Sequence, residues 1–255
     1  MCKFLITILL LVFLSGSASA QEITVAAAAD LNYALKDLAV RFEKKTGDKL
    51  TLSFGSSGNL FSQIQSGAPL DLFFSADEQY PQKLAAASLM DPASLRSYAV
   101  GHLVLWVPNS SSLDPQKLKM DLLLQPSVQH VAIANPQLAP YGRAAMAALE
   151  RSGLKEKLAS KLVFGENISQ AAQFVQSGNA QAGLIALSLA MSPAMKEAGR
   201  YWQLPSDSYP ELRQTAGIVS ASKHKQAAQA FLDYVTSPEG VAVLQQYGFA
   251  MPSGK

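Results

Sequence analysis

The sequence predicts an α/β fold of two lobes, each a mainly parallel sheet flanked by helices. Three observations support this fold class. Residues 22–29, 49–53 and 70–74 are apolar or alternating runs typical of strands, and each precedes a helical pattern. Residues 98–107 form a long apolar strand that we expect to cross into a second lobe. The strand and helix pattern then restarts at residues 131–134, which indicates a second sheet.

The first strand leads into an amphipathic helix. Apolar residues recur at helical spacing from Leu31 to Phe42, and Gly47 is a natural end for the helix. Asp30 precedes this helix, and we expect it in the N-cap position. Because strands and helices alternate here, the strands are expected to lie parallel with helices on the faces of the sheet.

The second strand ends in the turn Gly55-Ser56-Ser57-Gly58, which opens a short helix that ends at Gly67. Two glycines let the backbone fold tightly, and the hydroxyls and the unpaired N–H groups of the new helix point into the gap. Such a turn suits an anion. When the turn is taken alone, serines that only cap the helix are the better explanation, and the recurrence of such turns is what favours an anion site.

The second lobe repeats the same order of elements. After the strand at residues 131–134, Pro140 stands just ahead of a helix over residues 141–153, where a missing N–H does little harm. Further strands are expected at residues 162–164, 182–186, 201–204 and 215–219, and further helices at residues 168–175, 223–236 and 238–247. The strand at residues 215–219 is expected to return to the first lobe. We therefore assign residues 21–102 with 216–255 to lobe 1, and residues 103–215 to lobe 2.

The N-terminus predicts an exported protein. Lys3 is followed by an apolar block at residues 4–14 and by small residues up to Ala20, which is the pattern of a signal peptide cut near Ala20. Cleavage removes Cys2, the only cysteine, so the mature chain of 255 − 20 = 235 residues has no disulfide. The formal charge of +2 falls to +1 with the loss of Lys3, and no basic run suggests a nucleic-acid partner.

Four strand-to-helix turns share the features of the glycine and serine turn. In open parallel sheets, ligands bind at the carboxyl ends of strands, where helix N-termini converge. Two turns belong to each lobe, so a common ligand would lie in a cleft between the lobes. None contains lysine or arginine, and the nearest, Arg143, is expected to be solvated on a helix surface. Backbone N–H groups, hydroxyls and helix dipoles without a cation favour a small, fully ionised oxyanion. The turns are residues 29–31, 55–57, 140–142 and 166–168.

Several segments resemble the periplasmic molybdate-binding proteins of ABC transporters. They are residues 26–31, 54–58, 67–77 and 246–249, and the run Gly67-Ala68-Pro69-Leu70-Asp71-Leu72-Phe73-Phe74-Ser75-Ala76-Asp77 is the most specific of them. The resemblance covers essentially the whole mature chain. It implies a type II periplasmic-binding-protein fold, with two crossings between lobes that close over molybdate or tungstate. It also implies a periplasmic monomer without cofactor or catalysis, which delivers the oxyanion to a permease in the inner membrane.

Carried over residue by residue, the oxyanion contacts of that family fall on Asp30, Ser57, Tyr141 and Ile168. The resemblance implies that Tyr141 and Ile168 act through their backbone N–H groups, and Ser57 through both hydroxyl and N–H. No residue is expected to bind the metal atom directly. Two positions depart from the pattern, because some members have a serine where this chain has Asp30, and some have a tyrosine where it has Ala186.

Asp30 is the more serious departure. A carboxylate ~4 Å from an anion costs about 4 kcal/mol per unit charge at an effective dielectric constant of ~20, which exceeds the return from one hydrogen bond. We therefore expect its side chain to turn back and cap the helix at residues 31–33, with Asn32 as a substitute donor.

Other functions remain open at this point. An acidic residue in the site also suits another solute, such as sulfate, an iron complex or an organic anion. A serine hydrolase would use Ser57, but its turn lacks the G-x-S-x-G pattern and no histidine or acid is placed to activate it. Asp71 and Asp77 are expected to cap helices and bond to loops. The histidines show no metal-ligand spacing; they are His102, His130 and His224.

Overall fold

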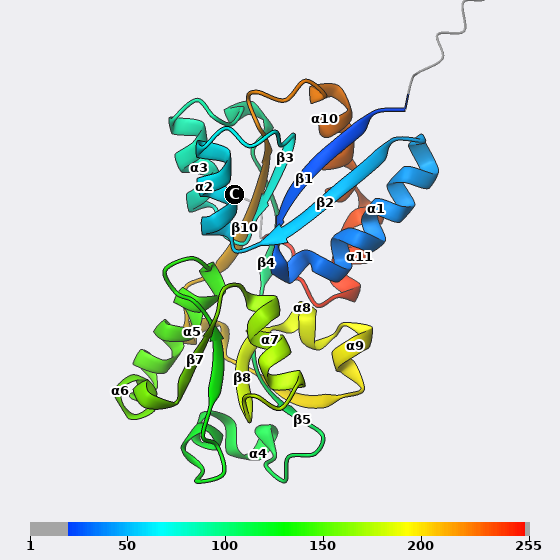
Figure 1. Ribbon diagram of the computed structural model, residues 1–255. Helices are drawn as coiled ribbons and strands as arrows, with labels where there is room; N and C mark the ends of the chain where they lie inside the picture. Colours follow the sequence, from blue (N-terminus) through cyan, green and yellow to red (C-terminus); the bar gives the residue numbers. More distant parts are fainter. Residues whose placement is uncertain (1–19, 253–255) are drawn as a thin grey trace, which may run out of the picture.

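The computed structural model describes residues 20–252 and has two α/β lobes, each with one five-stranded sheet (Figure 1). The two-lobed α/β fold is therefore confirmed. The expected signal peptide lies outside the described residues, apart from Ala20. Between residues 20 and 252, no helix is both long and apolar enough to cross a membrane.

The first sheet has the strand order β2-β1-β3-β10-β4. Strands β1, β2 and β3 pair in parallel, whereas β10 is antiparallel to both of its neighbours. Four of the five strands therefore run in one direction, as predicted. The bounds are β1 Glu22–Ala28, β2 Lys49–Gly55, β3 Leu72–Ser75, β4 Arg96–Gly101 and β10 Leu212–Ile218.

Alternation along β1 divides the core of this lobe into two layers. Ile23 and Val25 point to the face covered by α1, α10 and α11, whereas Ala26 points to the face covered by α2 and α3. Aromatic contacts fill the first layer, where the rings of Phe42 and Phe231 meet at 5.0 Å. The helices are α1 Asn32–Thr46, α2 Ser57–Gln65, α3 Gln79–Ala86, α10 Lys225–Val235 and α11 Pro238–Gln246, and a 3-10 turn, η2, spans Pro92–Ser94.

The second sheet repeats this design with the order β7-β6-β8-β5-β9, and β5 is its antiparallel strand. Its strands are β5 Leu103–Pro108, β6 Val131–Ala134, β7 Leu162–Gly165, β8 Ala182–Ala186 and β9 Gly199–Gln203. The helices are α4 Pro115–Leu118, α5 Pro140–Arg151, α6 Lys155–Leu158, α7 Ile168–Gln176, α8 Leu187–Ala190 and α9 Pro193–Lys196. Short 3-10 turns are η1 Ala29–Leu31, η3 Lys119–Leu124, η4 Ala159–Lys161 and η5 Ser206–Ser208.

The chain crosses between the sheets at a break in the strand that was expected over residues 98–107. That segment forms two strands, β4 and β5, which join different sheets on either side of His102. The return strand β10 enters the first sheet at Leu212. The lobe boundaries at residues 102/103 and 215/216 stay predictions.

Candidate functional site

Asp30 lies in the buried 3-10 turn η1, which connects β1 to α1. Helix α1 has Leu31 at its cap position and no side-chain cap. The Asp30 carboxylate instead accepts a hydrogen bond at 2.5 Å from Nε2 of Gln214 on β10. The expectation that Asp30 caps the helix is therefore wrong, because a buried amide donor from a distant strand holds the carboxylate.

Gln214 is the centre of a buried polar cluster that the local sequence patterns do not predict. Its Nε2 lies 3.3 Å from the Tyr141 hydroxyl, and its Oε1 accepts a 2.7 Å hydrogen bond from Tyr98. Burial raises the pKa of both tyrosines well above the usual range, so both hydroxyls stay neutral. Tyr98 donates to Gln214, whereas Tyr141 accepts from it. Strand alternation places Gln214 on the same face as Leu212 and Ala216. A lone amide among inward-facing apolar residues is the signal that could have identified it.

The serine turn divides its roles between neighbouring residues. Ser56 caps α2 through its side chain, which is the alternative that the sequence left open. The Ser57 hydroxyl accepts the N–H of Ala76 at 3.0 Å, which leaves the hydroxyl hydrogen for another acceptor. The N–H of Gly58 donates to the carbonyl of Leu138 in the second sheet's lobe at 2.8 Å. The N–H of Ser57, at the first position of α2, has no acceptor within the helix.

Tyr141 lies in the first turn of α5. This helix begins at Pro140, which has no N–H, and Ala139 at the cap position makes no side-chain cap. The N–H groups of Gly142 and Arg143 donate to the Ala139 carbonyl at 3.0 and 3.2 Å. The Tyr141 N–H is therefore the donor of this first turn that has no acceptor within the helix.

Ile168 opens helix α7. Asn167 caps this helix, because its Oδ1 accepts the N–H of Gln170 at 3.1 Å. The N–H of Ile168 lies at the first position of α7, where the helix contains no acceptor for it. The next residue, Ser169, reaches the other lobe, where its hydroxyl donates to the Ala29 carbonyl at 2.9 Å.

The structure brings turns from both lobes to one buried interface. The Ser188 hydroxyl of α8 donates to the Asp30 carbonyl at 2.8 Å, beside the bond from Ser169 to Ala29. The bond from Gly58 to Leu138 joins the turn at residues 55–57 to the loop that precedes the turn at residues 140–142. The four predicted contact residues are at most 3% exposed; they are Asp30, Ser57, Tyr141 and Ile168. Their role in holding a ligand stays a prediction.

Two further contacts connect the lobes at the edge of this interface. Arg143 of α5 forms a 2.5 Å ion pair with Asp77, and its guanidinium lies 5.5 Å from the ring of Tyr80. Asn59 donates to the Glu166 carboxylate at 2.7 Å. Arg143 was expected to be solvated on a helix surface, and its side chain is 37% exposed, but its guanidinium also pairs with a carboxylate of the opposite lobe. Asp77 also accepts the N–H of Tyr80 at 3.2 Å, which confirms its predicted capping role.

The chemistry of the interface is that of fixed neutral donors. Within residues 20–252, no ion pair joins a lysine or arginine to Asp30, and no group of three His, Cys, Asp or Glu side chains could hold a metal ion. The Ser57 hydroxyl contacts a backbone N–H and not a histidine. Burial raises the pKa of Asp30 to about 6, although the hydrogen bond from Gln214 opposes the shift.

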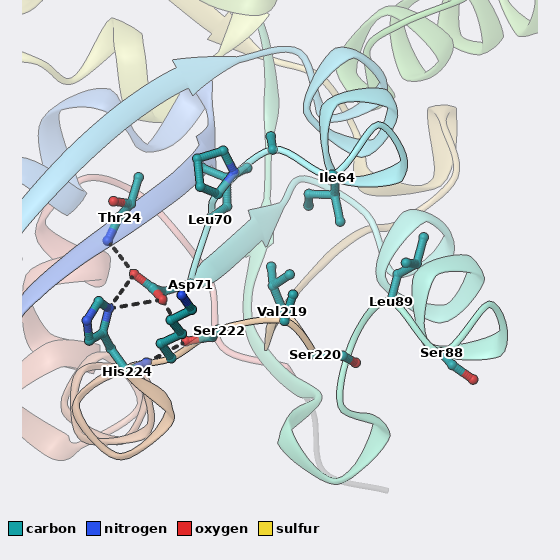
Figure 2. Close-up of a pocket in the computed structure, with 15 residues that line it drawn as sticks. Thr24, Ile64, Leu70, Asp71, Ser88, Leu89, Val219, Ser220, Ser222 and His224 are labelled. Carbon is teal, nitrogen blue, oxygen red and sulfur yellow. Dashed lines mark hydrogen bonds and ion pairs between the residues drawn. The ribbon is translucent and has the colours of Figure 1, made fainter.

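A separate pocket of about 630 Å³ lies at the amino ends of β1 and β3, and none of the four predicted contact residues lines it. Figure 2 shows Asp71, Ser222 and His224 at its wall. Asp71 lies at its wall and accepts the N–H of Thr24 at 2.8 Å and the hydroxyl of Ser222 at 2.6 Å. His224 lies 3.4 Å from the same carboxylate. These bonds tie the loop after β10 to β1 and confirm the loop bonding that was predicted for Asp71.

Asp71→Ala is expected to lower the free energy of unfolding by about 1–3 kcal/mol, because the partly buried N–H of Thr24 loses its acceptor. Asp71→Asn keeps an acceptor oxygen and is the matched control. Denaturant unfolding followed by circular dichroism measures both. An unfolding midpoint in Asp71→Ala equal to that of the unsubstituted protein would show that the carboxylate contributes no net stability.

Comparison with known proteins places both lobes in one group of relatives. A family model described as bacterial extracellular solute-binding protein matches residues 23–250. The molybdate-binding protein ModA of Azotobacter vinelandii is 42% identical over 238 residues, which are 93% of this chain and 93% of the relative. ModA of Rhodobacter capsulatus is 38% identical over 232 residues, or 91% and 89%. The solved Azotobacter vinelandii periplasmic molybdate-binding protein aligns with a TM-score of 0.85 and 35% identity, covering 91% of this chain and 100% of that chain.

Proposed function

Because this chain belongs to the bacterial extracellular solute-binding proteins, and within them to the family of the molybdate-binding proteins ModA, we propose that it captures molybdate. The observation that supports the proposal is that one buried interface joins helix-opening turns of both lobes, through the bonds from Gly58 to Leu138 and from Ser169 to Ala29. We therefore expect their first-turn N–H groups to face a common ligand. They belong to Ser57 on one side and to Tyr141 and Ile168 on the other. Tungstate has the same charge and shape, so we include it as a ligand.

The binding energy comes from the donors that the two lobes bring to the ligand when they close. Each helix N-terminus contributes about 0.3–1 kcal/mol to an exposed anion and up to ~2 kcal/mol to a partly buried one, and each charge-assisted hydrogen bond about 1.5–3 kcal/mol. An open form satisfies only one set of donors, so the ligand favours the closed form, in which both sets reach it. The bonds from Ser169, Ser188 and Gly58 to the opposite lobe stabilise that form.

The remaining features of the proposal follow from this role. The protein is a receptor and not an enzyme, acts as a monomer, and needs no cofactor besides its oxyanion cargo. It is exported to the periplasm and delivers the oxyanion to the inner-membrane permease of an ABC transporter. The names of the relatives support this assignment, since they describe periplasmic and molybdate-binding proteins.

Calorimetric titration of the mature protein with molybdate, tungstate, sulfate, phosphate and chromate tests the proposal. We expect saturation near one equivalent of molybdate or tungstate, with weaker binding of the other anions. The absence of saturation with every tetraoxyanion would overturn the proposal.

One observation favours a second candidate ligand. Oδ1 of Asp30 is buried and has no hydrogen-bond partner within residues 20–252. A ligand that carries its own O–H, such as hydrogen phosphate, would give that oxygen a donor. Tighter binding of phosphate than of molybdate in the same titration would favour this ligand over molybdate.

A further inference from the structure

Asp30 lies in an environment that exists only when the two lobes meet. Its carbonyl is covered by Ser188, and the adjacent carbonyl of Ala29 by Ser169, both from the opposite lobe. Tyr141, also from that lobe, approaches the amide that holds the carboxylate. With its partners in place, Asp30 is 1% exposed. Separation of the lobes would remove these three contacts and admit water to the carboxyl group.

The groups that face Asp30 are all neutral. Gln214 comes from β10, Tyr98 from β4 and Tyr141 from α5, and Ser188 contributes a hydroxyl from α8. At the edge of the interface, the charges of Arg143 and Asp77 neutralise each other. No cation within residues 20–252 pairs with Asp30. Only neutral donors, Gln214 and Tyr141 first among them, favour its ionised form, and the burial of the carboxyl group outweighs them.

The two oxygens of the carboxyl group are unequal. Oδ2 accepts the hydrogen bond from Gln214, whereas Oδ1 is buried without a partner among the described residues. Among the residues that the structure describes, Oδ1 of Asn32 is another buried oxygen without a hydrogen-bond partner. A buried acceptor without a donor is costly, and a proton on Oδ1 of Asp30 would turn this oxygen into a donor.

We propose, on the basis of the molybdate-binding function proposed above, that Asp30 is neutral in the closed liganded protein, so that each oxyanion captured is accompanied by uptake of one proton at Asp30. The protonated Asp30 side chain then offers a hydrogen-bond donor to the dianion, whereas an ionised carboxylate would repel it. Capture of MoO4²⁻ becomes the joint uptake of a dianion and H⁺, and the closed site gains one unit of negative charge instead of two.

The sign of the pH dependence follows from burial. Desolvation in the closed form raises the pKa of Asp30 to about 6, and a bound dianion would raise this pKa further. The open form exposes the carboxyl group, so its pKa returns towards the ordinary value. Binding therefore takes up protons, and affinity falls as pH rises from the open-form pKa to that of the liganded form, by up to about tenfold per pH unit.

Titration calorimetry with molybdate, run from about pH 6 to about pH 8 in buffers of different ionisation heat, tests the proposal. The dependence of the observed heat on the buffer gives the number of protons taken up. We expect a number approaching one at the lower pH for the unsubstituted protein, and an affinity that falls across the range. Asp30→Asn, which mimics the neutral acid, is expected to bind with no proton uptake and to bind more tightly than the unsubstituted protein at the highest pH.

Asp233→Asn is the matched control, since Asp233 is an exposed carboxylate on α10 and its removal should leave proton uptake unchanged. Molybdate binding with no proton uptake, or with equal uptake in Asp30→Asn, would overturn the inference and leave the proposed function standing. Failure of every tetraoxyanion to bind would overturn both.

Discussion

Gly58→Ala is expected to weaken oxyanion binding by about 10- to 100-fold, because the added methyl group obstructs closure. A Cβ atom at Gly58 would lie 2.7 Å from the Leu138 carbonyl oxygen and 2.8 Å from the Tyr80 hydroxyl. The carbonyl belongs to the backbone of the opposite lobe and cannot turn aside. Relief of such overpacking costs about 1–3 kcal/mol, and the open form avoids the part of that cost that comes from Leu138. The substitution therefore shifts the equilibrium towards the form that binds weakly.

Gly55→Ala is the matched control for this prediction. Gly55 belongs to the same turn, but a Cβ atom there would lie 3.4 Å from the side chain of Leu60, which is an ordinary contact. Titration calorimetry gives the affinity of both variants, and thermal unfolding without ligand shows whether either has lost stability. Equal affinities for the two variants would mean that the close approach of Gly58 to Leu138 is not needed for binding.

Much of the fold could be predicted because its signals are local. The apolar runs at residues 131–134 and 182–186 are strands with those same bounds, since buried parallel strands are short and continuously apolar. The recurring turns could be predicted for a related reason. A strand followed by a helix leaves N–H groups at the carboxyl edge of the sheet, whatever the side chains are.

The polar contacts of the interface could not be predicted from local patterns. Gln214 meets Asp30 across 184 positions of sequence, and Arg143 meets Asp77 across 66. Their partners depend on how the two lobes meet, which no window of sequence shows. The local pattern therefore predicts a helix cap for Asp30, whereas the tertiary structure supplies a better donor.

Ile168→Pro is expected to weaken oxyanion binding by about 10- to 150-fold, because it removes one backbone donor while α7 stays intact. Proline is tolerated at the first position of a helix, where its fixed φ suits the helix and the lost N–H has no acceptor within it. Asn167 has φ −140° and ψ 176°, an extended conformation that a following proline permits. A charge-assisted hydrogen bond to the dianion contributes about 1.5–3 kcal/mol, and this bond is the one that proline deletes.

Ile168→Ala separates the lost donor from the lost side chain. Ile168 is 3% exposed, so both variants lose core packing, but only alanine keeps the N–H. Calorimetric titration with molybdate should therefore show a much larger loss of affinity for proline than for alanine, with similar unfolding temperatures for the two unliganded variants. If the two bind equally well, the N–H of Ile168 does not reach the ligand, and the second lobe must contribute its donors from elsewhere, with the Tyr141 N–H of α5 as the remaining predicted one.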